Sequence, residues 1–208
     1  MAPQRQRILL VGASGVIGRW VHEALRDQHD VLTAGLDQGD LQVDLADAGA
    51  LQAALAGLGS LDAVISTAGR ARFSPLAAVS CAALDDSVYG LGLRDKLMGQ
   101  VNLALAARTI VRPGGSITLT SGTTSEDPVL GGSSLSMVNG ALQSWVRAAA
   151  TEWPHGQRIN LVSPSLVEGT PAAALAAFPG FEVVSGRRVA LAYLRCLFSG
   201  INGLVLRV

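Results

Sequence analysis

Lys96 is the only lysine in a chain with fifteen arginines. A lysine that is partly desolvated in a cleft has a lowered pKa, so its amine can act as a base, an acid or an imine-forming nucleophile. Ser121 and Asn139 would add a hydroxyl group and an amide to such a site. The alternative interpretation is an exposed lysine, or one that forms an ion pair with the neighbouring Asp95.

A glycine-rich stretch, VGASGVIG, places Gly12, Gly15 and Gly18 between an apolar run and a helical pattern. Glycines at this spacing allow backbone amides and a helix N-terminus to face a pyrophosphate. Ser14 and Ile17 lie in the same turn, so we expect these five residues to bind a dinucleotide. The alternative is a tight strand-to-helix turn without a ligand.

Short β-rich runs alternate along the chain with amphipathic helical patterns, which is typical of a parallel sheet covered on both faces. Seven strands are expected, at Ile8 to Val11, Val31 to Ala34, Leu41 to Val43, Ala63 to Ser66, Ser116 to Thr120, Ile159 to Val162 and Leu204 to Arg207. Helices are expected at Val16 to Asp27, Ala48 to Ala56, Asp85 to Val111, Ser134 to Trp153 and Arg187 to Phe198. Because crossovers between parallel strands are right-handed, we predict an α/β fold with one doubly wound parallel sheet flanked by helices. It forms a single domain over residues 1–208, with a short lid near 171–181.

The helix predicted at Ser134 to Trp153 has two different faces. Apolar residues recur along it at steps of three and four, so this face is expected to pack on a core. The opposite face carries Ser136, Asn139 and Gln143. We therefore expect this helix to present hydroxyl and amide groups, without an acid or a base.

Composition excludes several classes of partner. Sixteen basic residues balance sixteen acidic ones, so no charge excess is available for a nucleic-acid backbone or an anionic membrane surface. The first apolar run is too short for a signal peptide or a membrane span. Cys81 and Cys196 lack the spacing of metal ligands, and two thiols are typical of a reducing compartment. We expect a cytoplasmic protein that binds no nucleic acid, membrane or metal.

Five stretches in order resemble motifs of the short-chain dehydrogenase/reductase family, over nearly the whole chain. They are VGASGVIG, QVDLAD, STAG, GGSITLTSG and INLVSPS. The resemblance implies a Rossmann-type fold that binds NAD(P). It places Asp44 and Leu45 beside the adenine, and Ala68 and Gly69 in the turn next to the cofactor.

The choice between NAD and NADP stays open. In the family, residues just after the second strand contact the adenosine ribose and distinguish NAD from NADP. This chain has Gly35 and Leu36 there. Asp37 follows and could bind a ribose hydroxyl, whereas Ser14 or Arg19 could serve a 2′-phosphate.

The resemblance also shows what the chain lacks. In that family a Ser, a Tyr and a Lys four residues after the Tyr polarise a carbonyl and donate a proton, and an Asn on the preceding helix holds a water relay. The corresponding positions here are Gly122 beside Ser121, Leu135, Asn139 and Lys96. Leu135 cannot donate a proton, and Asn139 cannot lower the pKa of a phenol as a lysine cation does. The chain resembles a subgroup that keeps the glycine motif without these residues, and Lys96, Ser121 and Asn139 are the candidate catalytic residues.

Three functions fit these residues. The first is an NAD(P)(H)-dependent oxidoreductase acting on a small organic molecule that needs little acid help, such as an enone or imine, and the resemblance favours it. The second is a non-redox enzyme of a small-molecule biosynthetic pathway, such as a cyclase, isomerase, dehydratase or aldol-type catalyst. The third is a non-catalytic dinucleotide sensor. The family also implies a homodimer or homotetramer that pairs the helices expected at Asp85 to Val111 and Ser134 to Trp153, where Trp145 and Val146 would supply apolar surface.

Overall fold

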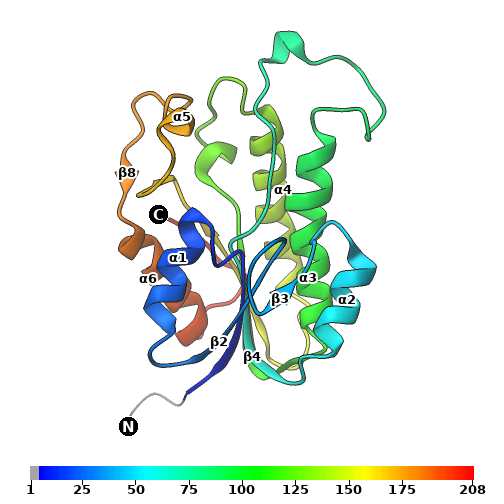
Figure 1. Ribbon diagram of the computed structural model, residues 1–208, viewed down its shortest axis with the longest axis vertical. Coiled ribbons are helices and arrows are strands. Elements are labelled where there is room, and N and C mark those ends of the chain that lie inside the picture. The colour runs from blue at the N-terminus through cyan, green and yellow to red at the C-terminus, as the bar shows by residue number, and fades with distance from the viewer. Residues whose placement is uncertain (1–4) are drawn as a thin grey trace.

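A seven-stranded parallel sheet lies between two layers of helices in the computed structural model, which describes residues 5–208 (Figure 1). The strand order is β3-β2-β1-β4-β5-β6-β9. The strands are β1 (Arg7–Val11), β2 (Asp30–Gly35), β3 (Leu41–Gln42), β4 (Leu61–Ser66), β5 (Val111–Thr120), β6 (Arg158–Ser163) and β9 (Val205–Arg207). The predicted α/β fold with a doubly wound sheet is confirmed, with β5 beginning earlier than expected. Residues 1–4 of the predicted domain lie outside the described part.

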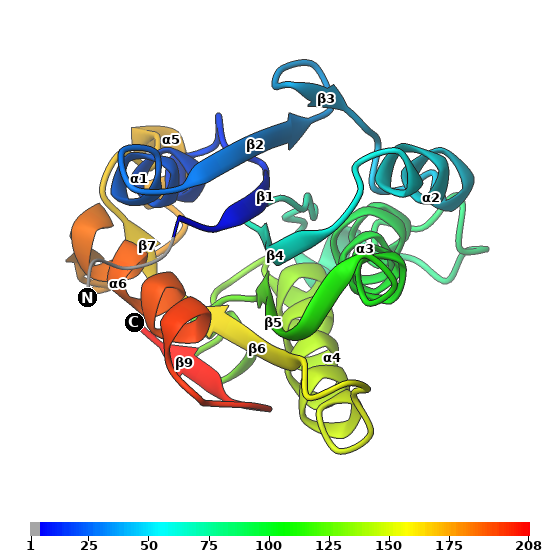
Figure 2. The ribbon, with the colours of Figure 1, turned by 90° about the horizontal axis from the view of Figure 1, so that it is seen from below.

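Helices cover both faces of the sheet. Figure 2 shows α1 and α6 on one face and α2, α3 and α4 on the other. The helices are α1 (Val16–Leu25), α2 (Ala48–Ala56), α3 (Gly99–Ala107), α4 (Ser133–Ala149), the short α5 (Ala172–Leu175) and α6 (Gly186–Phe198). Shorter helical segments are η1 (Leu76–Ala78), the π-helical η2 (Gly92–Met98) and η3 (Thr123–Ser125). Within residues 5–208, none of the helices is long and apolar enough to cross a bilayer.

The sequence of β1 explains why the sheet is buried on both faces. Its side chains alternate between two apolar cores. Leu9 and Val11 belong to the core shared with α2, α3 and α4, and Ile8 and Leu10 belong to the core shared with α1 and α6. Because the strands are parallel, they all end at the same edge of the sheet, which faces upward in Figure 1 and carries the candidate site.

The helix predicted at Asp85 to Val111 is shorter than expected, and it consists of a π-helical segment followed by an α-helix. Residues 85–89 form turns, the π-helical segment η2 precedes α3, and the helix ends at Ala107. The chain turns closely before η2, where a Cβ atom on Gly90 would collide with the carbonyl oxygen of Leu84. Helical periodicity cannot reveal such a contact, so the prediction extended the helix too far.

The prediction that Val146 adds apolar surface to α4 was wrong, whereas Trp145 is partly exposed. Val146 is fully buried in the core, and Trp145 packs against that core and against Trp153, with ring centroids 6.1 Å apart. This helix buries more than one stripe, because it packs both on the sheet and on the polypeptide that follows β5.

A second, two-stranded sheet closes the base of the predicted lid. β7 (Leu166–Val167) pairs in parallel with β8 (Val183–Val184), and the lid lies between them. Phe178 in the lid contacts Phe73 of the β4–η2 connection, with ring centroids 5.9 Å apart. This pair of strands was not predicted, because a two-residue strand is too short to show a period.

Candidate functional site

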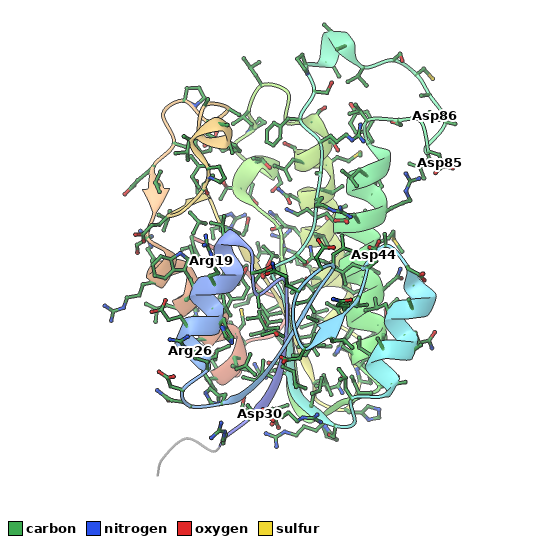
Figure 3. The ribbon with its side chains drawn as sticks, in the orientation of Figure 1. Arg19, Arg26, Asp30, Asp44, Asp85 and Asp86 are labelled. Atoms are coloured by element: carbon green, nitrogen blue, oxygen red, sulfur yellow. The ribbon has the colours of Figure 1, made fainter. Side chains whose placement is uncertain are left out.

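A cleft of about 600 Å³ opens at the ends of β1 and β4. The chain leaves β1 toward β2 and β3 on one side and returns to β4 on the other, and such a reversal is where open α/β sheets bind ligands. Seven of the nine predicted cofactor residues line this cleft: Gly12, Ser14, Gly15, Asp44, Leu45, Ala68 and Gly69. Figure 3 shows Asp44 at this edge of the sheet.

The glycine turn after β1 lies very close to the turn after β4. Gly12 has φ of +85°, and a Cβ atom there would lie 2.9 Å from the backbone nitrogen of Ala68. Thr67 links the two turns, since its hydroxyl group donates to the carbonyl oxygens of Val11 and Gly12, each at 3.0 Å. No side chain caps the N-terminus of α1 at Gly15. The first amides of α1 are thus open to an anion in the cleft.

Ile17 and Gly18 lie beneath the cleft and do not line it. Ile17 packs against the core of the α1 and α6 face. A Cβ atom on Gly18 would collide with the carbonyl oxygen of Gly12, so this glycine lets α1 pack on its own turn. Both residues lie in the first turn of α1 and not in the loop before it, and the motif spacing does not separate contact with a ligand from packing.

Charged residues line one part of the cleft, and two of them were missed. Asp37, Asp44, Arg70 and Asp95 all line it. The guanidinium group of Arg70 binds the carboxylate of Asp95 through Nε at 2.8 Å and Nη2 at 2.7 Å. Only two features of the sequence could have placed them in the site: Arg70 follows the STAG turn, and Asp95 precedes Lys96.

Lys96 is buried, with 9% of its surface exposed, at the ends of β4 and β5. Its Nζ donates to the carbonyl oxygen of Ser121 at 3.3 Å. Burial lowers the pKa of Lys96 to about 8, and the carboxylate of Asp95 partly opposes this effect. The alternative of an exposed or ion-paired lysine is therefore wrong, because Asp95 binds Arg70 instead.

Ser121 and Asn139 are both buried near the end of β5. The Ser121 hydroxyl group has no hydrogen-bond partner among the described residues, and neither has Oδ1 of Asn139. Nδ2 of Asn139 donates to Oγ1 of Thr124 at 2.8 Å. Ser136 donates to the Thr124 carbonyl oxygen, and Gln143 to the hydroxyl group of Ser125. The polar face of α4 thus holds η3, the turn that follows β5.

Gly122 packs closely against the side chain of Asn139. A Cβ atom on Gly122 would lie 2.9 Å from Nδ2 of Asn139. Both tyrosines are engaged elsewhere: the hydroxyl group of Tyr193 is buried 2.6 Å from that of Thr120, and the hydroxyl group of Tyr89 lies 3.2 Å from that of Ser133. Over residues 5–208, no group of three or more His, Cys, Asp or Glu could hold a metal ion. Among the described residues at the ends of β4 and β5, Lys96 supplies the amine and Ser121 a hydroxyl group without a hydrogen-bond partner.

Comparison with known proteins gives one family model and several solved structures. Residues 12–194 match the family model described as enoyl-(acyl carrier protein) reductase. The protein lin1944 from Listeria innocua is 36% identical, with a TM-score of 0.92, and the match covers 98% of this chain and 99% of that chain. No curated protein matches the chain.

Two more distant structures share the fold. A small-chain dehydrogenase in complex with NADPH is 24% identical, with a TM-score of 0.84 and coverage of 99% of this chain and 97% of that one. A short chain dehydrogenase from Burkholderia cenocepacia J2315 in complex with NADP is 23% identical, with a TM-score of 0.82 and coverage of 100% and 98%.

Proposed function

The chain belongs to the short-chain dehydrogenase/reductase family, and from this membership we propose that it is an oxidoreductase that binds NAD(P)(H) and acts on a small organic molecule. The cleft at the ends of β1 and β4 carries the proposal, because its lining combines the glycine turn, Asp44 with Leu45, and Ala68 with Gly69. The uncapped N-terminus of α1 supplies amides for a diphosphate. Two structural neighbours are described as NADPH and NADP complexes.

The bound dinucleotide would supply the hydride, and the protein would manage the proton. Lys96 lies against Gly69 of the cleft, and its amine reaches the end of β5. An amine with a pKa of about 8 changes protonation near neutral pH, which suits general acid or base catalysis. Ser121 offers a free hydroxyl group beside it. Without a phenol at position 135, the substrate is one whose reduction needs little acid help, such as an enone or imine.

We further propose that NAD is preferred over NADP. The cleft holds three carboxylates, and its one guanidinium group is bound to one of them. A 2′-phosphate would meet the like charges of Asp37 and Asp44. Arg19 does not compensate, because its side chain reaches toward Gly169 and is absent from the cleft lining (Figure 3). A like charge at about 4 Å costs about 1–4 kcal/mol, so NADH should bind about fivefold more tightly or better.

Calorimetric titration with NADH and NADPH tests both statements. We expect NADH to bind more tightly, and Gly15→Val to abolish binding because its side chain stands where a diphosphate approaches the amides. Gly200→Ala is the matched control, since a Cβ atom there meets nothing within 4 Å. Absence of binding by the unmutated protein at millimolar NADH and NADPH would disprove the cofactor proposal. A preference for NADPH would disprove the electrostatic argument alone.

A non-redox enzyme is the second candidate. Gly122 and Leu135 leave no acid at the usual positions, and Asn139 is engaged with Thr124. Turnover of a substrate without any change in the absorbance of bound NADH at 340 nm would favour this alternative. A protein that binds NADH and turns over nothing would instead be a sensor.

A further inference from the structure

The π-helical segment η2 places two consecutive residues in different surroundings. Asp95 lines the dinucleotide cleft, whereas Lys96 is directed to the end of β5, where its amine contacts Ser121. π-Helical turns are rare and often occur at functional sites. The two side chains are therefore adjacent in the chain but belong to the cofactor cleft and to the proton site respectively.

One turn of the backbone contacts both of them. Gly69, with φ of +141°, packs so closely that a Cβ atom there would lie 2.7 Å from Cγ of Lys96. The next residue, Arg70, donates its backbone N–H to Oδ1 of Asp95 at 2.5 Å, and its guanidinium group binds Oδ2. The carboxylate of Asp95 thus fixes the β4 turn against η2, directly beside the lysine.

Gln100 provides a second anchor, on the β5 side. Its Oε1 accepts the backbone N–H of Thr120, and its Nε2 donates to the carbonyl oxygens of Thr120 and Lys96, at 2.8 and 3.2 Å. Backbone and side chain of Lys96 are therefore held from both strand ends. Of the described residues, Ser121 supplies the one hydrogen-bond acceptor for Nζ, although an ammonium group carries three N–H donors.

Few charges surround Lys96. Asp95 on its own segment is the charged group that acts on the pKa of Lys96, and Arg70 from the β4 turn binds the carboxylate of Asp95. Thr120, Ser121 and Gln100 on the β5 side are neutral, as are Ser134 and Val138, the α4 residues that pack on η2 at Gly92. The carboxylate of Asp95 favours the ammonium form of Lys96, and the guanidinium group of Arg70 offsets that carboxylate.

We propose that Asp95 is a positioning residue that couples occupancy of the dinucleotide cleft to the Lys96 amine. This inference rests on the proposed cofactor. Over half of the Arg70 side chain is exposed, in a cleft built for an anion. An anionic dinucleotide attracts that guanidinium group, so it offsets Asp95 less and the lysine binds its proton more firmly. Cofactor binding would then prepare Lys96 as a proton donor.

A single lysine makes the test direct. Lysine labelled with ¹³C gives one Cε signal in the folded protein, and its chemical shift reports the protonation of Lys96 without any substrate. We expect Asp95→Asn to lower the pKa of Lys96 by about one unit, and Arg70→Gln to raise it. Asp27→Asn is the control, because Asp27 is exposed just after α1, on the other face of the sheet. NADH should raise the pKa in the unmutated protein and less in Asp95→Asn.

The two variants give opposite signs, which a merely structural role would not produce. The positioning role is disproved if folded Asp95→Asn and Arg70→Gln, judged by the remaining spectrum, leave the Lys96 titration unchanged or shift it in the same direction. Should Asp95→Asn fail to fold, Arg70→Gln alone decides. Calorimetry measures NADH binding separately. If NADH does not bind, the proposed function fails while the two variants still test the role of Asp95.

Discussion

Lys96 is a buried cation in a protein that could have placed an apolar residue there. Burial disfavours its charged form, so its pKa in the folded state, about 8, lies below the ordinary value of 10.5. Below pH 8 the lysine is protonated in both states, and the whole desolvation cost acts against folding. Between about pH 8 and 10.5 the folded protein releases the proton first, so stability rises with pH.

Lys96→Met should therefore stabilise the protein. At pH 7 we expect the free energy of unfolding to increase by roughly 1–3 kcal/mol, and the gain to vanish by about pH 10.5. Urea unfolding at pH 7 and pH 10 measures both. Arg108→Met, which removes an exposed cation of the α3 C-terminus, is the control and should show no such dependence on pH. Equal stability of Lys96→Met and the unmutated protein at pH 7 would contradict the cost of burial. A stabilising substitution at this position would support a functional reason for the lysine.

The polar face of helix α4 has a structural role in this protein. Ser136, Asn139 and Gln143 all hold η3. Because a side chain at position 122 would meet Asn139, substitutions at these two positions are coupled, and the family resemblance predicts a Ser and a Lys there. A serine introduced alone at position 122 would crowd the amide, so the two positions must change together.

We expect the combined variant Gly122→Ser, Leu135→Tyr, Asn139→Lys to gain reduction of unactivated ketones. A positioned phenol contributes about 10²–10⁴-fold in rate as a proton donor to a ketone, and the unmutated protein has Leu135 in that place. NADH oxidation with a panel of simple ketones measures the gain. The matched control keeps Leu135 and carries the other two substitutions, so it lacks only the phenol. Equal rates for the two variants would show that the phenol at position 135 alone does not restore ketone reduction.

Secondary structure and the cleft could be predicted because they depend on local pattern. The strands show β-rich runs of apolar residues, and Gly12 with its neighbours forms one turn, so their spacing indicates their role. Arg70 and Asp95 could not be predicted as a pair, because their contact joins residues 25 positions apart. The same reason applies to β7 with β8 and to the burial of Val146, which depend on how distant segments pack.

Oligomerisation stays a prediction, and the exposed surface of the α3 and α4 layer supports it. Met98, Leu105 and Met137 are exposed apolar residues on η2, α3 and α4. We propose a homodimer through this layer, since paired helices give two-fold interfaces. Leu105→Glu with Met137→Glu should then yield monomers in light scattering after size exclusion. Leu191→Glu, an exposed residue of α6 on the opposite face, should leave the mass unchanged. A monomeric unmutated protein at working concentration would refute the proposal.

The pairing of β7 with β8 bears on how this protein can change over evolutionary time. Two hydrogen-bonded strands fix the ends of the lid, while the seven-stranded sheet continues without it. Closing a loop whose ends are already joined costs little more when the loop grows, about 0.6 kcal/mol for each doubling of its length. The polypeptide between the two strands can therefore be exchanged, lengthened or shortened as a cassette. Sequence changes in this segment can therefore accumulate while the seven-stranded sheet stays the same, as in antibodies, whose binding loops vary on a constant scaffold.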